Sequence, residues 1–360
     1  MKKLYLAIVI AVFAGASVFF FVQKENSSSH KIPTPTPQSS TTQQDGINVI
    51  PTMRDKISEN STWCGTLQLV WNEAIDNIVK QDITFSPQTD VAANLNKRTF
   101  SANDLSDTYY YKIFDNMTPG LKIKIEKAIK EKFDQESDIL NDFDWTPSPD
   151  KYFAYAMLYR KFEFLKTFED LDVGNFGKET NIKYFGTKDS EQAKRQIDVM
   201  CYDNDNNFAV VLNTKTNDQV VLIKNPIGST FQEIYDTAIN KANSFTGDTS
   251  LEDKENFKMP NLEINEKKDF LELENKPFST KNGDIMRITK VIQTIKFKID
   301  KSGGEIKSEA GMAMDMGMTL QENKPREFYI DDTFAIFLRE KGKTKPYFAG
   351  KISDIKEFQK

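Results

Sequence analysis

The chain has 360 residues, a formal net charge of −5, and basic residues dispersed among acidic ones, which argues against a nucleic-acid partner. Its single histidine, His30, lies in a stretch rich in Ser, Thr, Pro and Gln, so the rest of the chain has none. Histidine-dependent catalysis and histidine-ligated zinc are therefore excluded there, and no cofactor motif such as a glycine-rich phosphate loop occurs. We expect no enzyme, no cofactor and no metal site.

The N-terminal segment is apolar and uncharged from Leu4 to Val22, after two lysines. A bilayer core takes about 20 apolar residues as a helix, and basic flanks stay in the cytoplasm. Residues 1–25 are therefore predicted to be a single-pass anchor in the cell membrane, with the rest of the chain outside. Cleavage after Ala14-Gly15-Ala16 is the alternative, and it would secrete the protein.

A polar linker comes after this segment. From Asn26 to Asp45 the only apolar side chain outside the prolines is Ile32, too little to offset the entropy of ordering the chain. We assign residues 26–52 to a disordered linker and residues 53–360 to one folded domain.

The domain has two cysteines, Cys64 and Cys201. Outside the cytoplasm they can form a disulfide, and the alternative is that both stay buried as free thiols. An acidic run at residues 203–207 alternates like a calcium loop, but Phe208 and Thr214 stand where that loop needs Gly and Glu. The run lies between two apolar stretches, which predicts a hairpin turn.

Helices are predicted in the first part of the domain. Apolar residues recur at helical spacing from Trp63 to Val79, and a second helix begins at Pro119 with Thr118 as its cap. A break comes at residues 145–149. The dense apolar stretch from Tyr152 to Phe168 fits either a helix or a buried strand.

Strands are predicted in the second part. Short apolar runs between polar turns indicate strands at 196–202, 208–214, 219–224, 257–264, 291–299, 333–339 and 346–352. In the stretch 291–299, Thr294, Lys296 and Lys298 would occupy the polar face. Gly303-Gly304 interrupts the chain after this stretch, and residues 231–245 form one further helix ended by Gly247. Helices followed by strands predict an α+β domain.

Motifs near the C-terminus resemble the serpin family. Residues 328–334, Phe-Tyr-Ile-Asp-Asp-Thr-Phe, resemble the serpin signature Phe-x-x-Asp-x-Pro-Phe, with Thr333 in place of Pro. Residues 347–352, Tyr-Phe-Ala-Gly-Lys-Ile, resemble the next serpin strand, Leu-Phe-x-Gly-x-Val. Weaker matches keep the serpin order upstream: residues 85–87, Tyr159 with Lys161, Phe164 and Phe168, residues 259–264, and residues 288–297.

The resemblance implies a serpin-like α+β fold with N-terminal helices, a large central sheet, further sheets and an exposed reactive loop. In that family a protease cleaves the loop, the first part of the loop inserts into the central sheet, and the acyl-enzyme is trapped. The hinge of the loop would be Ser308, Glu309, Ala310, Gly311, Met312 and Ala313, which resemble Thr-Glu-Ala-Ala-Ala-Ala. The scissile bond would lie among Met316, Gly317, Met318, Thr319, Leu320, Gln321 and Glu322.

Alternation in this loop is compatible with insertion. In a strand, Ala310 and the methionines at 312, 314, 316 and 318 would share one face, and Asp315 would take the other. The alternative is a flexible Met-rich loop, since methionine adapts to loosely defined contacts.

Two functions from different classes remain open. The first is a surface-tethered suicide inhibitor whose partner is a serine or cysteine protease. The second is a non-inhibitory binding or scaffold domain at the cell surface.

Overall fold

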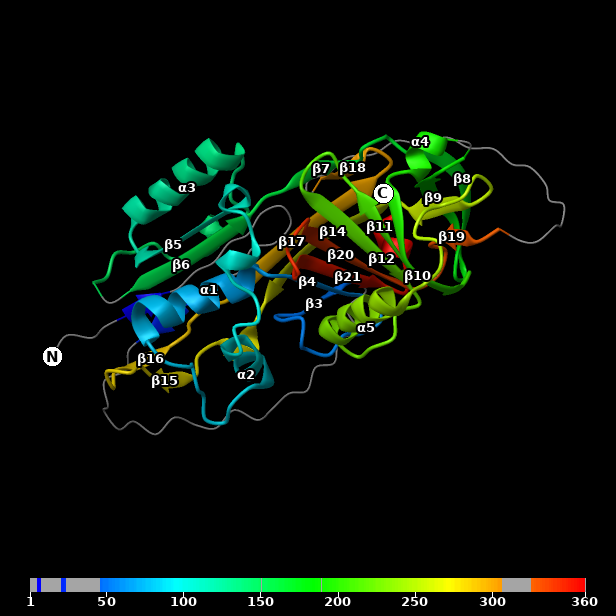
Figure 1. Ribbon diagram of the computed structural model, residues 1–360. Helices are drawn as coiled ribbons and strands as arrows, with labels where there is room; N and C mark the ends of the chain where they lie inside the picture. The colour runs from blue at the N-terminus through cyan, green and yellow to red at the C-terminus, as the bar shows by residue number, and fades with distance from the viewer. Residues whose placement is uncertain are drawn as a thin grey trace.

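A seven-stranded sheet forms the largest layer (Figure 1). The computed structural model describes residues 5–7, 21–23, 46–149, 151–188, 190–305 and 325–359. In sheet order the seven strands are β10 (Ile197–Asn204), β11 (Asn207–Asn213), β12 (Asp218–Lys224), β20 (Phe334–Glu340), β21 (Pro346–Ile352), β4 (Ser61–Cys64) and β3 (Asn48–Val49). All neighbours are antiparallel except β3 and β4. Its central strands β12 and β20 are rich in buried Val, Ile, Leu and Phe, as strands covered on both faces should be.

Smaller sheets surround this layer. One contains β19 (Glu327–Tyr329), β13 (Asn256–Pro260), β9 (Glu179–Gly186) and β8 (Glu169–Phe176). A second contains β14 (Leu262–Asp269), β17 (Ile292–Asp300), β18 (Gly303–Glu305) and β7 (Lys161–Glu163). Two-stranded sheets pair β5 (Tyr110–Asn116) with β6 (Tyr152–Leu158), and β15 (Pro277–Ser279) with β16 (Ile285–Arg287).

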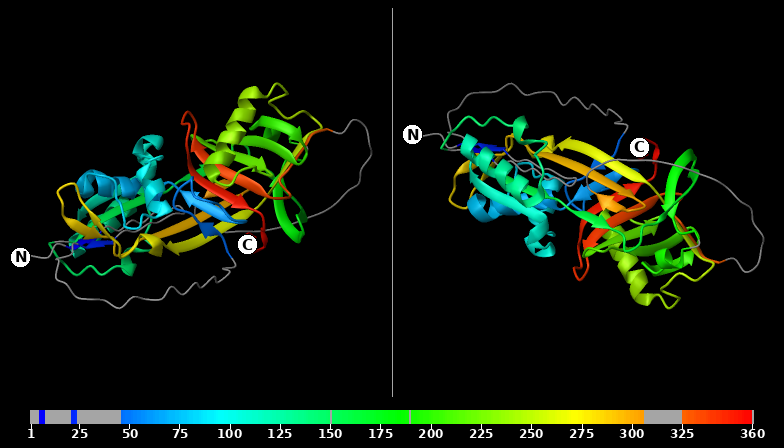
Figure 2. Two further views of the ribbon diagram at one scale, coloured as in Figure 1. Left: turned by 90° about the horizontal axis from the view of Figure 1, so that it is seen from below. Right: turned by 90° about the horizontal axis from the view of Figure 1, so that it is seen from above.

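The longer helices pack against the sheets: α3 (Pro119–Phe133) lies over the β5–β6 pair and α5 (Phe231–Ser244) over the seven-stranded sheet (Figure 2). The other helices are α1 (Thr66–Ala74), which continues as a π-helix (Ile75–Val79), α2 (Asp90–Asn96) and α4 (Glu191–Lys194), with short 3₁₀ turns at Ala102–Asp104, Asp107–Tyr109, Leu140–Asp142, Leu271–Leu273 and Lys356–Phe358. The side chain of Thr118 accepts the N–H of Leu121 at 3.1 Å, which confirms the predicted cap of α3. The expected α+β class is confirmed by this arrangement.

The N-terminal segment differs from the predicted helix where the structure describes it. Its described residues form β1 (Tyr5–Ala7) and β2 (Phe21–Gln23), which pair antiparallel, with β1 next to β6 and β2 next to β16. Aromatic and β-branched residues such as Phe21 and Val22 favour extended backbone, which helical hydropathy counting does not register. Within the described ranges no helix has the length and apolar character needed to cross a membrane. The candidate cleavage site at 14–16 and residues 26–45 of the linker lie outside the described residues.

Two boundaries also differ from the sequence expectation. The fold includes residues 46–52, because Ile47, Val49 and Ile50 are buried and β3 pairs with β4. The predicted helix from Trp63 to Val79 is a strand and a helix: β4 ends at Cys64 and α1 begins at Thr66. The apolar pattern of the helix continues into Trp63 and Cys64 of β4 by chance. A fully buried strand lacks the polar alternation that would have identified it as a strand. Residues 85–87 lie in the connection between the π-helix and α2.

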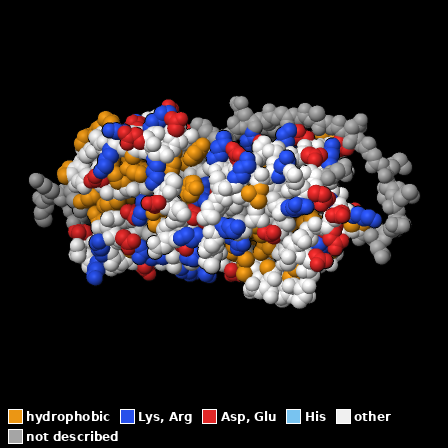
Figure 3. Space-filling model, turned by 45° about the horizontal axis from the view of Figure 1, so that its top comes forward, with side chains coloured by type: hydrophobic (Ala, Val, Ile, Leu, Met, Phe, Trp, Pro, Cys, Tyr) orange, Lys and Arg blue, Asp and Glu red, His pale blue; other side chains and the backbone are white. Residues whose placement is uncertain are grey.

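A second hydrophobic core lies between α3 and the β5–β6 pair. It comprises Met117, Leu121, Ile125, Ile129, Phe133, Ile139, Leu140, Phe143, Phe153, Tyr155, Met157 and Ile292. Ile292, the first residue of β17, is the member that connects this core to the β14–β17 sheet. Figure 3 shows hydrophobic side chains gathered at the end of the molecule that carries α3, whereas charges of both signs mix over the other end.

The two cysteines do not pair. Both are free and buried, and they lie on β4 and β10, with β21, β20, β12 and β11 between them. Strands are spaced about 4.8 Å apart, so five steps separate the two residues by roughly 24 Å, well beyond the reach of a disulfide. The acidic run at 203–207 is a hairpin turn, as predicted, with Asn204 opposite Asn207.

Candidate loop-insertion site

The short strand β18 lies between two longer segments of chain. Gly304 is opposite Ile299 of β17 on one side and opposite Phe162 of β7 on the other, and both pairings are antiparallel. Two glycines are required here. Gly303 has φ +148°, and a Cβ on it would approach the carbonyl oxygen of Phe162 to 2.2 Å. The Gly303-Gly304 pair, which the sequence predicts to interrupt the chain, therefore lets β18 pack closely against Phe162 of β7.

Beyond β18, no described strand pairs with both β17 and β6, although β1 lies next to β6. Among the described residues β6 pairs only with β5, and β17 pairs only with β14 and β18. Because β17 and β7 are both antiparallel to β18, they run parallel to each other, and β7 comes two residues after β6. A strand that extended β18 would therefore run between β17 and β6 and be antiparallel to β17. A strand that runs antiparallel to both β17 and β6 could therefore be added between them, and we call this place the opening.

The predicted hinge, residues 308–313, and the predicted scissile region, residues 316–322, lie outside the described residues. The structure places the two ends of the segment that contains them. It starts after Glu305 at the end of β18 and returns at Pro325 just before β19.

Gln293 of β17 is buried next to this opening. Its side-chain amide donates to the carbonyl oxygen of Cys64 at 3.3 Å and to the hydroxyl of Thr66 at 3.4 Å. Its Oε1 has no hydrogen-bond partner among the described residues. A buried acceptor left unpaired costs about 1–3 kcal/mol, so a donor that arrived here would stabilise β17.

Two of the three residues on the polar face predicted for β17 are buried, which corrects the sequence expectation, whereas Lys296 is half-buried. Thr294 is 4% exposed and Lys298 is 8% exposed. Alternation indicates which residues share a face but not whether another layer covers that face.

The far end of the segment is held by Arg326, just before β19. Its guanidinium forms a fork on Glu255, with N–O distances of 2.5 and 2.8 Å, and donates to the carbonyl oxygens of Asp248 and Ser250 at 2.9 and 3.0 Å. The same group lies over the ring of Phe328. Burial would raise the pKa of Glu255, but the hydrogen bonds from Arg326 and from the backbone N–H of Glu252, together with the charge of Arg326, hold that pKa below its ordinary value.

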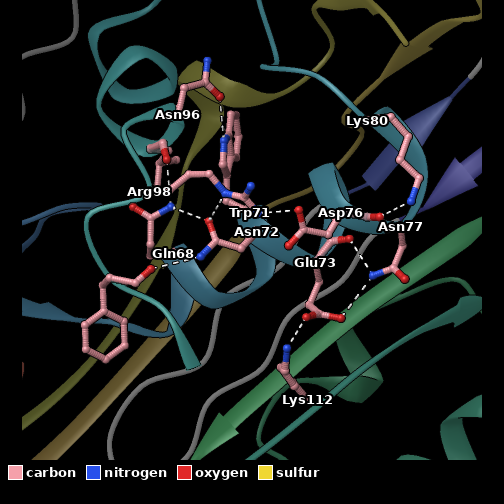
Figure 4. A network of polar contacts seen from close by, with 12 residues as sticks. Gln68, Trp71, Asn72, Glu73, Asp76, Asn77, Lys80, Asn96, Arg98 and Lys112 are labelled. Atoms are coloured by element: carbon pink, nitrogen blue, oxygen red, sulfur yellow. Dashed lines mark hydrogen bonds and ion pairs between the residues drawn. The ribbon is translucent and has the colours of Figure 1, made fainter. Parts of the chain in front are cut away.

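A polar network attaches α1 to its neighbours (Figure 4). Asn72 accepts hydrogen bonds from Gln68 at 3.1 Å and from Arg98 at 3.3 Å, and Glu73 forms an ion pair with Lys112 of β5. α1 is thereby connected both to the segment after α2 and to the β5–β6 pair. Gln68 and Asn72 pair at helical spacing, but Arg98 and Lys112 are distant in sequence, so no local pattern indicates these two contacts.

Sequence reasoning also missed Arg326 and Gln293. Arg326 stands two residues before the signature that begins at Phe328, where a charge next to an aromatic run could have suggested an anchor. Gln293 belongs to an alternating strand pattern, and only its burial distinguishes it.

Comparisons with known proteins come from structure alone. A scan against protein-family models finds no match, and a search of curated proteins finds none either. Solved structures do resemble this chain. Thyroxine-binding globulin in complex with thyroxine matches with TM-score 0.42 and 12% identity over 65% of this chain and 64% of that one. The chain thus spans less than two thirds of that protein.

Two insect proteins match over a larger share of their length. A highly specific serpin of Tenebrio molitor matches with TM-score 0.36 and 12% identity, over 70% of this chain and 78% of that one. SRPN18 from Anopheles gambiae matches with TM-score 0.40 and 10% identity, over 74% and 82%. The two insect proteins are serpins, the family that the C-terminal motifs of this chain resemble.

Proposed function

We propose that this chain is an extracytoplasmic, membrane-tethered suicide inhibitor of serine or cysteine proteases that acts by loop insertion. One observation carries the proposal: β18 already pairs with β17 and β7, and among the described strands only β5 pairs with β6. Cleavage within 306–324 would free the segment from its attachment at Arg326. The freed segment could then extend β18 residue by residue, with Ala310 and the methionines at 312, 314, 316 and 318 on one face.

The test uses the full-length protein before and after limited proteolysis within 306–324. We expect the cleaved protein to melt at a higher temperature than the intact one, because the inserted strand gains backbone hydrogen bonds on both sides. We also expect an SDS-resistant covalent complex with at least one serine or cysteine protease. A cleaved sample that melts at the same temperature as the intact sample would rule out insertion.

A matched pair of variants controls this test. Ala310→Pro removes a backbone donor and should abolish the gain in melting temperature, since proline is not accepted inside a sheet. Ala310→Val keeps the donor and favours extended backbone, so the gain should persist. Equal behaviour of the two variants would show that residue 310 does not enter the sheet.

A non-inhibitory binding domain is the second candidate, and a cleft favours it. The cleft has a volume of about 200 Å³, and its lining residues are Met53, Trp63, Thr99, Phe100, Gln232, Tyr235, Asp236, Thr344, Lys345 and Pro346. Three aromatic side chains and the carboxylate of Asp236 suit a small aromatic ligand that carries a positive charge or a hydrogen-bond donor. This candidate predicts cleavage without a gain in melting temperature. It also predicts that a ligand found by thermal shift still binds Ala310→Pro but binds Asp236→Asn more weakly.

A further inference from the structure

Arg160 is a buried charge at the junction of β6 and β7. Its side chain is 1% exposed, and its Nε lies 2.5 Å from Oδ1 of Asp218, while Nη1 pairs with Oε1 of Glu340. The guanidinium carbon stacks 3.7 Å from the centre of the Tyr109 ring. A fully buried arginine needs such partners, because an uncompensated charge in the interior is costly.

The two carboxylates are themselves neighbours. Asp218 begins β12, Glu340 ends β20, and the two residues are directly opposite in the antiparallel ladder. Like charges opposite each other destabilise a sheet, and the guanidinium of Arg160 contacts both carboxylates and compensates their charge. Other donors complete the cluster: Tyr347 donates its hydroxyl to Asp218 at 2.7 Å, and Ser106 donates its hydroxyl to Glu340 at 2.6 Å. The hydrogen bonds from Ser106 and the charge of Arg160 outweigh burial and keep the pKa of Glu340 below its ordinary value.

This cluster connects β7, the neighbour of β18, to the seven-stranded sheet. β12 and β20 belong to the seven-stranded sheet, whereas Arg160 directly precedes β7, the strand that pairs with β18. A second attachment acts at the same place, where the backbone N–H of Lys215 donates to the carbonyl oxygen of Glu163 at 2.8 Å. The position of β7, and through it the position of β18, is therefore set by two contacts: that of Arg160 with the two acids and that of Lys215 with Glu163.

We propose that Arg160 is a positioning residue for loop insertion. Its guanidinium, held between Asp218 and Glu340, fixes β7 against the seven-stranded sheet and so keeps β18 aligned with the opening between β17 and β6. This role rests on the proposed function, but the alignment itself can be measured in the uncleaved protein.

The experiment is amide hydrogen exchange on the full-length protein and on the triple variant Arg160→Met, Asp218→Asn, Glu340→Gln. The triple variant removes all three charges and keeps similar side-chain volumes, so it should fold. We expect amides at 161–163 and 303–305 to exchange about tenfold faster, because their pairing opens locally, while those of β14 are unchanged.

Lys224→Met is the matched control. Lys224 ends β12 and is a buried cation at the end opposite Asp218, with its Nζ 2.6 Å from Asp331. Its removal should leave exchange at 161–163 and 303–305 unchanged. The proposal is overturned if the triple variant exchanges at the wild-type rate there, if exchange rises equally in β14, or if the control variant reproduces the effect.

A cleavage assay separates this proposal from the proposed function. If cleavage raises the melting temperature of the wild-type protein, the same rise should develop about tenfold more slowly in the triple variant. The reason is that β18 of the variant is aligned with the opening for a smaller fraction of the time. An equal rate in the two proteins would overturn the positioning role. If the wild-type protein gains nothing, loop insertion fails, and the exchange data still decide whether Arg160 aligns β7 and β18.

Discussion

The two ends of segment 306–324 are held in different ways. At the first end, β18 is attached by backbone pairing and by two glycines that fit against Phe162. At the second end, Arg326 forms a fork on Glu255 just before β19, and β19 itself pairs with β13. Backbone pairing can be extended by any residue that has an N–H, whereas a fork fixes one residue in one place. At the first end β18 can therefore be lengthened, whereas at the second end the chain stays fixed at Arg326.

The largest expected effect concerns Arg160, which supports the first end. Arg160→Met alone leaves two buried carboxylates facing each other and should lower the free energy of unfolding by about 3–5 kcal/mol. The triple variant with Asp218→Asn and Glu340→Gln should recover most of this loss. Urea denaturation of the three proteins measures both values. If the single variant also loosens the segment at 325–329 in hydrogen exchange, the two ends are not independent and the comparison fails.

Arg326 is the corresponding residue at the second end. Arg326→Ala leaves Glu255, whose side chain is 5% exposed, without its charged partner, and should lower the free energy of unfolding by about 3 kcal/mol. A double-mutant cycle with Glu255→Gln isolates the coupling. Lys127→Ala is the control. Its ion pair with Glu131 is exposed on both sides and should contribute less than about 0.5 kcal/mol. A coupling energy near zero would show that the fork does not hold this end.

Gly303→Ala tests the fit of the first end. The new Cβ would lie 2.2 Å from the carbonyl oxygen of Phe162, so β18 must shift, at a cost of about 1–3 kcal/mol. Gly342→Ala is the control, because Gly342 also has a positive φ but nothing within 4 Å of the added atom. Equal losses in thermal or urea unfolding would mean that backbone conformation alone, and not the contact with β7, matters at Gly303.

The smallest effect is a pH dependence at the second end. The pKa of folded Glu255 lies below its ordinary value of 4.5, so its ionised form stabilises the fold. That contribution is complete above the pKa of the unfolded chain and is lost as the pH falls from about 4.5 through the lower folded pKa. Unfolding measured at stepped pH values should show Glu255→Gln losing less stability than the wild-type protein over this window. Parallel curves would contradict the assignment.

The sequence predicted the regular elements better than the site. α3, α5 and the strands β10, β11, β12, β20 and β21 appear where periodicity and turn residues place them. Arg160 could not be recognised, because its partner Glu340 lies 180 positions away and a lone arginine in an apolar stretch reads as an exposed residue. The pattern at Gly303-Gly304 indicates only a break in the strand. Their close contact with Phe162 depends on a tertiary pairing that no local pattern encodes.

The burial of Cys64 and Cys201 has a practical consequence for studying the loop. Burial raises the pKa of the Cys64 thiol to about 11 and also raises that of Cys201. Thiol reagents attack the thiolate, and a thiol of pKa 11 is ionised in roughly one molecule in ten thousand at neutral pH. Burial also disfavours the thiolate of Cys201, so a cysteine introduced within 306–324 could be labelled with a maleimide dye in the presence of two buried native thiols. Fluorescence from that dye could follow the loop in real time in the otherwise unaltered protein.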